Sequence, residues 1–119
     1  MKRSLGPKTL AYPTPVFLVA SYDAGGRANV MTAAWGGICC SKPPCVAVSL
    51  RAATYSHGCI RERGAFSVNI PAVDQVREAD FFGVVSGRER DKLAEAGMST
   101  VASELVDAPL IEQCAFALE

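Results

Sequence analysis

The chain has 119 residues, of which 50% are hydrophobic and 20% are charged. This length and composition predict one globular domain, residues 1–119, with an apolar core. Twelve basic residues balance twelve acidic ones. Proteins that bind nucleic acid or an anionic membrane usually carry a basic excess, so we expect neither partner. No apolar run approaches the roughly 20 residues that span a bilayer, and the first residues lack the apolar core of a signal peptide. We therefore expect a cytoplasmic protein.

The cysteines and the single histidine limit the metal and thiol chemistry that the chain can carry. The five cysteines contain no C-x-x-C pair, so no zinc site is expected. We predict free thiols, most of them buried. A disulfide between the adjacent Cys39 and Cys40 would be strained, which makes a thiol redox protein the weaker alternative. His57 falls in the first turn of a predicted helix and is interpreted as a partly exposed helix residue.

The first half of the chain predicts an arm followed by a β-hairpin. Residues 1–12 form an extended N-terminal arm in this prediction. Pro15–Tyr22 and Arg27–Thr32 are β-favouring runs, and the two glycines of Asp23–Gly26 allow the positive φ angles of a tight turn between them. The segment Ala33–Gly37 joins small residues to the only tryptophan, a composition that lets the backbone approach a flat or bulky group.

The central segment predicts a strand, a turn, a short helix and a second strand. Cys45–Leu50 and Phe66–Ile70 are the β-favouring runs. Between them, Thr54 stands where an N-cap is expected and Gly64 is a stop signal for the helix.

The turn before this helix gathers groups that bind anions. Ser49, Arg51, Thr54 and Ser56 offer hydroxyls and a guanidinium close to the free N–H groups and positive dipole of a helix start. This combination suits a phosphate monoester better than a carboxylate. The alternative is that Arg51 is a solvated surface charge and Thr54 only caps its helix.

The last third predicts short helices and two more strands. Ala72–Phe82 is predicted as an amphipathic helix capped by Asp74 and ended by Gly83. The charged segment before Leu93–Ala96 is typical of a solvated helix start. The two predicted strands are Thr100–Val106 and Ile111–Leu118.

Six predicted strands and two or three short helices indicate a mainly β fold. A partly closed β-barrel with short α-helices packed outside fits better than a doubly wound sheet, because strands and helices do not alternate regularly. The chain stops at Glu119, directly after a predicted strand, so we expect an edge that something must cover.

From about Pro13 to its end the chain resembles the flavin reductase-like family, whose members adopt an FMN-binding split β-barrel. The resemblance implies that fold, shortened at the C-terminal side, because family members continue well past the position of Glu119. It rests on the order and spacing of short motifs. These are Pro13-Thr-Pro15-Val16, Asn29-Val-Met-Thr-Ala-Ala-Trp35, Lys42-Pro-Pro44, Ser49-Leu-Arg51 with Thr54, Phe66-Ser-Val-Asn-Ile-Pro71, Asp80–Gly83, Ser86-Gly87, Asp91-Lys92 and Ala108-Pro-Leu110.

The resemblance implies FMN as the cofactor, with its phosphate at the turn before the central helix and its ring along the segment after the hairpin. The cofactor-binding residues implied are Met31, Thr32, Ala33, Ala34, Trp35, Ser49, Leu50, Arg51, Thr54, Tyr55, Ser56, Asn69 and Lys92. For Trp35 the alternative is a place in the core. For Asn69 it is an ordinary strand-end amide, and for Lys92 a solvated lysine in a charged run.

The activity implied is that of a redox protein that passes hydride or electrons from NADH or NADPH through FMN to a flavin or a protein acceptor. Such chemistry needs no side-chain acid or base, because the cofactor supplies it. Two alternatives stay open: a flavoredoxin-type electron carrier that does not oxidise NAD(P)H, and a flavin-free binding module on the same barrel. The resemblance also implies a homodimer with FMN near the interface.

Overall fold

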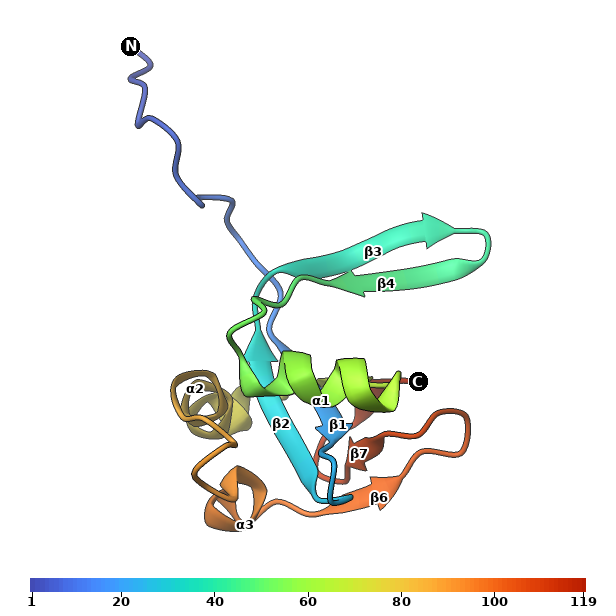
Figure 1. The fold of residues 1–119 in the computed structure, drawn as a ribbon. Helices are drawn as coiled ribbons and strands as arrows, with labels where there is room; N and C mark the ends of the chain where they lie inside the picture. Colours follow the sequence, from blue (N-terminus) through green and yellow to red (C-terminus); the bar gives the residue numbers. More distant parts are fainter.

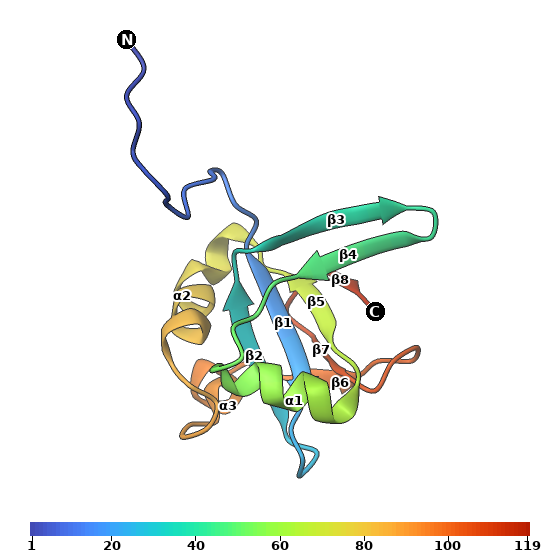
Figure 2. The same ribbon diagram turned by 45° about the horizontal axis from the view of Figure 1, so that its top comes forward.

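The computed structural model describes residues 1–119, and a four-stranded antiparallel sheet lies at its centre (Figure 2). The strands are β1 (Phe17–Tyr22), β2 (Ala28–Ala33), β5 (Ser67–Ile70) and β8 (Phe116–Leu118), in the order β2-β1-β5-β8. The predicted hairpin is confirmed, since β1 pairs with β2 along its whole length and Gly26 in the turn has a φ of 81°. Strand β2 is therefore one edge of the sheet.

One face of the sheet carries the main core. Side chains alternate between the two faces of a strand, and Leu18 and Val30 point to this face. Against it pack α2 (Val76–Val84), α3 (Lys92–Ala96) and β7 (Pro109–Ile111). The buried apolar cluster at their centre consists of Leu18, Val30, Ala79, Phe82, Leu93 and Ile111.

The opposite face of the sheet is covered by α1 (Tyr55–Arg63), which lies across β1 and β2 (Figure 1). Val19 and Met31 are paired across these two strands, so both side chains point to this face. Thr54 is the N-cap of α1, and Gly64 ends the helix with a φ of 71°. Both predictions are confirmed.

Between β2 and α1 in the chain, a two-stranded ribbon projects from the body (Figure 1). It consists of β3 (Gly36–Ser41) and β4 (Pro44–Val48). Strand β4 overlaps the predicted run Cys45–Leu50 but ends at Val48, so Ser49 and Leu50 lie outside the strand. Strand β3 was not predicted, because it begins with two glycines, which are weak β-formers, and it is stabilised by its pairing with β4.

Several predicted boundaries differ in the C-terminal third. Gly83 lies inside α2 and does not end it. Asp74 does not cap that helix, because it lies within the short 3₁₀ helix Val73–Gln75. The predicted strand Thr100–Val106 ends early as β6 (Thr100–Ala102). The predicted single strand Ile111–Leu118 is divided into β7 and β8 by a turn.

The prediction of a mainly β fold with short helices is confirmed, with eight strands and three short α-helices. The prediction that most cysteines are buried is wrong. Cys39, Cys40 and Cys45 are exposed on the ribbon, and only Cys59 is fully buried. All five thiols are free.

Residues 1–16 contain no helix or strand, and most of this segment runs away from the body (Figure 1). None of the helices is long and apolar enough to cross a membrane.

Candidate functional site

A pocket of about 220 Å³ lies at the β2 edge of the sheet, where the N-terminus of α1 meets the connection from α2 to α3. Its lining brings together segments that are far apart in the sequence. The lining residues are Met31, Arg51, Ala53, Thr54, Tyr55, Ser56, Phe82, Gly83, Val84, Val85, Ser86, Gly87 and Lys92. No aspartate or glutamate is among them, while one arginine and one lysine are.

Lys92 contributes a buried positive charge to the pocket. Lys92 as a whole is only 4% exposed, and its Nζ donates a hydrogen bond of 3.1 Å to the carbonyl oxygen of Phe82 near the end of α2. Burial lowers the pKa of Lys92 to about 8. An ammonium group has three N–H donors, and Phe82 takes one of them. The other donors are available to a bound anion, which would also relieve the cost of burying the charge.

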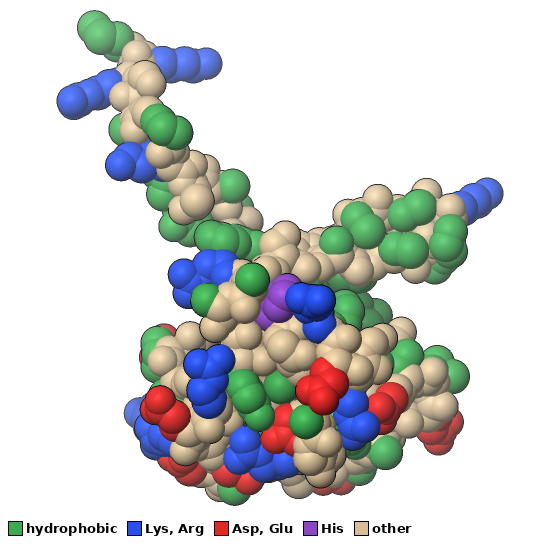
Figure 3. Space-filling view, viewed as in Figure 1, with side chains coloured by type: hydrophobic (Ala, Val, Ile, Leu, Met, Phe, Trp, Pro, Cys, Tyr) green, Lys and Arg blue, Asp and Glu red, His purple; other side chains and the backbone are tan.

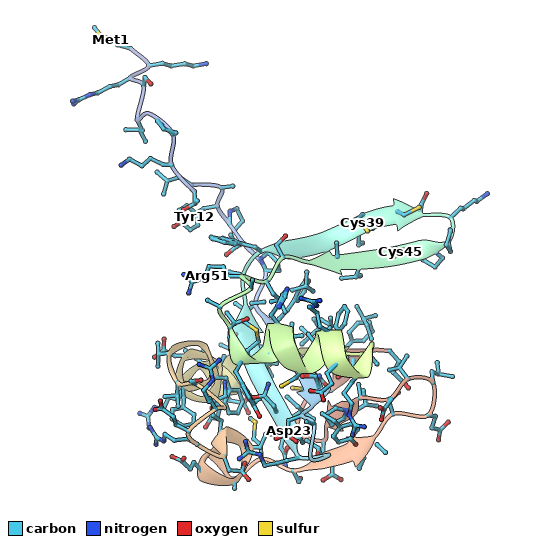
Figure 4. The ribbon with its side chains drawn as sticks, in the orientation of Figure 1. Met1, Tyr12, Asp23, Cys39, Cys45 and Arg51 are labelled. Carbon is cyan, nitrogen blue, oxygen red and sulfur yellow. The ribbon has the colours of Figure 1, made fainter.

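Arg51 contributes the second positive charge, from the segment between β4 and α1. Figure 4 shows it at the base of the ribbon, close to the start of α1. It is exposed and makes no ion pair with a carboxylate of the chain. A guanidinium without a carboxylate partner keeps its in-plane N–H donors free for a phosphate or carboxylate ligand.

The start of α1 adds hydroxyl and amide donors. The Thr54 hydroxyl is used within the chain, since it donates to the Arg51 carbonyl oxygen at 2.9 Å and accepts from the His57 amide at 3.3 Å. The Ser56 hydroxyl accepts from Asn29 Nδ2 at 2.8 Å, which leaves its own proton for a ligand. The first amides of the helix have no intrahelical acceptor. Thr54 therefore stabilises the start of α1, and Ser56 lines the pocket with a hydroxyl proton that no group of the chain accepts.

A hydrogen-bonded network behind the pocket fixes the position of α1 relative to the hairpin. Tyr55 donates to Asp23 Oδ2 at 3.2 Å, and the Arg27 guanidinium binds both Asp23 and, at 2.9 Å, the carbonyl oxygen of Gly87. Burial alone would raise the pKa of Asp23, but hydrogen bonds from Arg27 and Tyr55 outweigh it and lower the pKa. Asp23 therefore stays ionised and anchors three segments of the site.

Gly87 forms a tight part of the pocket wall. A Cβ built at this position would lie 2.0 Å from Asn29 Oδ1 and 3.1 Å from the Tyr55 ring. No larger residue fits there without displacing the buried Asn29 amide, which is bonded to Ser56. The glycine thus allows the loop after α2 to close on α1.

Of the residues that the sequence predicted for the cofactor, the structure brings six together in this pocket. They are Met31, Arg51, Thr54, Tyr55, Ser56 and Lys92. Ser49 and Leu50 line a neighbouring cavity of about 460 Å³ instead, together with His57 and Arg61. In Figure 3 the histidine lies in the hollow between the ribbon and the body, beside a basic side chain.

The segment 31–35, which was predicted to lie along the flavin ring, has residues on both faces of β2 and in the exposed connection after it. Met31 and Ala33 alternate with Thr32, whose Oγ1 donates to the Ala79 carbonyl oxygen of α2 at 2.5 Å. Trp35 is 50% exposed, which excludes its alternative place in the core. Ala34 is also exposed. A ligand along this segment would contact alternate side chains and the backbone.

Asn69 is not brought to the pocket. It pairs with Leu18 across β1 and β5, so it points to the core face of the sheet. Its Nδ2 donates to the Leu18 carbonyl oxygen and to Ser67, and its Oδ1 accepts from the Ile111 amide at 2.9 Å. The side-chain amide is thus used in joining β7 to the sheet.

Among the lining or supporting residues missed by the sequence reasoning are Asn29, Gly83, Ser86 and Gly87. All four belong to motifs that carried the family resemblance. The signal was present, but nothing in a single sequence shows that the loop after α2 lies against α1.

The pocket thus brings two cationic side chains and several hydroxyl and amide donors together at the edge of the central sheet. The family model for the flavin reductase like domain matches residues 9–119, and the chain belongs to this family.

Three solved structures resemble it closely. Flavoredoxin of Desulfovibrio vulgaris (Miyazaki F) is 56% identical with a TM-score of 0.90, over 95% of this chain and 62% of that one. Flavoredoxin from Methanosarcina acetivorans is 31% identical with a TM-score of 0.89, over 99% and 62%. The FMN-binding domain of a flavin reductases-like enzyme from Shewanella baltica is 28% identical with a TM-score of 0.80, over 88% and 55%.

These matches confirm the predicted split β-barrel fold. The chain spans 41%, 60% and 53% of the lengths of three curated relatives that it matches.

Proposed function

We propose that this protein is an FMN-binding redox protein and that the pocket between α1 and the α2–α3 connection holds the FMN phosphate. The observation that carries the proposal is the convergence of Arg51, Lys92 and the free donors of the α1 N-terminus in a pocket without carboxylates. The solved FMN-binding domain at 28% identity supports the choice of ligand.

The donor set fits a phosphate monoester. Such a group is a dianion near neutral pH and offers three terminal oxygens, each able to accept more than one hydrogen bond. Lys92 and Arg51 supply charge-assisted donors, and Ser56 and Ser86 supply hydroxyls. The Ser86 hydroxyl accepts from the Arg88 amide at 3.2 Å and keeps its proton for the ligand. A carboxylate would leave part of this set unused.

Met31 and the exposed start of the ribbon extend the site beyond the phosphate. Met31 lies on the pocket face of the edge strand, and Ala33 is the next residue of β2 on that face. Ala34 is exposed and its small side chain leaves the main chain accessible there, and main-chain N–H and C=O groups tune a bound flavin by hydrogen bonding. When bound, FMN supplies one- and two-electron redox chemistry. The chain's residues hold and orient it.

Two redox functions fit this site, and they differ in the source of the electrons. A flavin reductase takes hydride from NADH or NADPH, and an electron carrier exchanges electrons with a protein partner. The resemblance to two flavoredoxins at 56% and 31% identity supports the carrier form. We propose the carrier form first and NAD(P)H-dependent flavin reduction second.

The test is to purify the protein, record its visible spectrum, release any chromophore by heat and identify it. We expect FMN near one per chain, and slow oxidation of NADH and NADPH compared with reduction by a low-potential electron-transfer protein. A colourless protein that also fails to quench the fluorescence of added FMN would refute the proposal. Fast turnover with NADPH or NADH would select the reductase form.

Association of two chains stays a prediction. An apolar groove of about 690 Å³ between the ribbon and the β5–β8 edge, lined by Ile38, Val46, Phe116 and Leu118 among others, is a surface available for it. Light scattering after size-exclusion chromatography measures the mass in solution. A mass of two chains would support the prediction, and a mass of one chain would contradict it.

A further inference from the structure

Three of the five cysteines lie together at the outer end of the ribbon, outside the site described above. Cys39 and Cys40 are on β3, and Cys45 is on β4 (Figure 4). All three are exposed and free. None of the three lines the proposed FMN pocket, so their chemistry is independent of FMN binding.

The pairing of the two strands brings these thiols into register. Cys40 is the direct partner of Cys45, and Ile38 is the direct partner of Val46. Strand β3 therefore advances two residues where β4 advances one, so Cys39 is the extra residue of a β-bulge. A bulge sets two residues of one strand opposite a single residue of the other. Here both bulged positions and the opposing position are cysteines.

The backbone geometry of such a pair permits a disulfide. Directly opposed residues of antiparallel strands have their Cα atoms about 4.5 or 5.5 Å apart. Disulfides span about 4.4–6.8 Å between Cα atoms, so either spacing is compatible with a bond between Cys40 and Cys45. The bond between the adjacent Cys39 and Cys40 is strained by comparison. The Cys39 thiol contacts the carbonyl oxygen of Cys45 at 3.6 Å.

The other two cysteines are less accessible than those of the ribbon. Cys59 is buried in α1 and Cys114 is half-buried against the core. Burial raises the pKa of both thiols, which lowers their thiolate fraction near neutral pH. Thiol chemistry with an external reagent is therefore expected at the ribbon.

We propose that Cys40 and Cys45 are a reversible dithiol–disulfide site that exchanges with low-molecular-weight disulfides. The Cys40 thiolate attacks a sulfur of the external disulfide, which releases one thiolate and leaves a mixed disulfide on Cys40. The Cys45 thiolate then attacks the Cys40 sulfur and releases the second thiol. Two protein thiols are oxidised and one external disulfide is reduced to two thiols. The roles of Cys40 and Cys45 can be exchanged without changing this balance.

The experiment places the full chain in buffers with different ratios of reduced to oxidised glutathione, followed by acid quenching and alkylation of the remaining thiols after unfolding. Mass spectrometry then counts the alkylated cysteines and maps any disulfide. In the wild type we expect the loss of two hydrogens, three alkylated cysteines out of five, and a Cys40–Cys45 bond that dithiothreitol fully reverses. Cys39→Ser is the matched control and should form the same bond. Cys40→Ser and Cys45→Ser should instead retain a glutathione adduct.

Three results would overturn the proposal. One is a persistent glutathione adduct on the wild type with no internal disulfide. Another is an internal disulfide of the wild type or of Cys40→Ser that includes Cys39, because the register would then not select the partner. The third is oxidation that only links two chains, as seen on a non-reducing gel.

Discussion

Replacing Lys92 with methionine should make the stability of the unliganded protein less dependent on pH. Methionine keeps the unbranched shape and removes the charge. Burial lowers the pKa of Lys92 from 10.5 to about 8, so the unfolded chain holds this proton more tightly than the folded one. The contribution of Lys92 to the free energy of unfolding is therefore least favourable below pH 8 and rises between pH 8 and pH 10.5. Above pH 10.5 the whole gain in stability is present. The whole difference is worth ~3 kcal/mol.

Urea unfolding at pH 7.5 and pH 10, with a thiol reductant and Trp35 fluorescence as the signal, measures this effect. About 2 kcal/mol of the gain falls between these two pH values. Other groups titrate in the same range, so the informative quantity is the stability of the wild type minus that of Lys92→Met. We expect this difference to become more favourable to the wild type by about 2 kcal/mol at pH 10. An unchanged difference would show that the ammonium is not buried as described.

The same titration should affect ligand binding in the opposite sense. Above pH 8 the folded protein loses the ammonium proton, so the affinity for FMN should fall as the pH rises. Fluorescence titrations at several pH values measure this. Lys92→Met should bind more weakly throughout and lack the fall near pH 8, and a parallel pH profile for both proteins would contradict the assignment of Lys92 to the phosphate.

Three further substitutions, two of them paired with a control substitution, test the pocket and its surroundings. Arg51→Ala should weaken FMN binding by roughly 10- to 100-fold, the effect of one or two lost charge-assisted hydrogen bonds, whereas Arg61→Ala in the neighbouring cavity should have little effect. Gly87→Ala should cost about 1–3 kcal/mol of stability and weaken binding, because its Cβ meets a buried amide at 2.0 Å. Gly58→Ala, with nothing within 4 Å of its Cβ, should stabilise α1 by about 0.5–1 kcal/mol. Asn69→Ala should cost at least about 2 kcal/mol on urea unfolding and leave the Kd for FMN of the folded protein within a factor of about two, since its amide bonds lie on the core face.

Much of the local structure around the site was predictable because it depends on neighbouring residues. Thr54 caps α1 and Gly64 ends it through contacts within a few positions of the sequence. The turn between β1 and β2 follows in the same way from its glycines. The anion-binding character of Arg51 and Ser56 was visible for the same reason.

What was not predictable depends on contacts between distant segments. Lys92 stands in a charged run and suggested a solvated side chain as its alternative, yet the end of α2 buries it. Asn69 lies within a motif of the resemblance, but the face of the sheet on which it lies is set by its pairing with Leu18. The three exposed cysteines follow from a ribbon that projects from the body, and β3 has no strong signal of its own.

The most direct test of the account compares FMN with riboflavin, which has the same ring system and lacks the phosphate. Isothermal titration of the flavin-free protein at pH 7 should give one FMN site per chain and at least about 100-fold weaker binding of riboflavin, since two cations and several donors act on the phosphate alone. In the double variant Arg51→Ala, Lys92→Met this preference should largely disappear. Equal affinities of the wild type for FMN and riboflavin would contradict the claim that this pocket is a phosphate site.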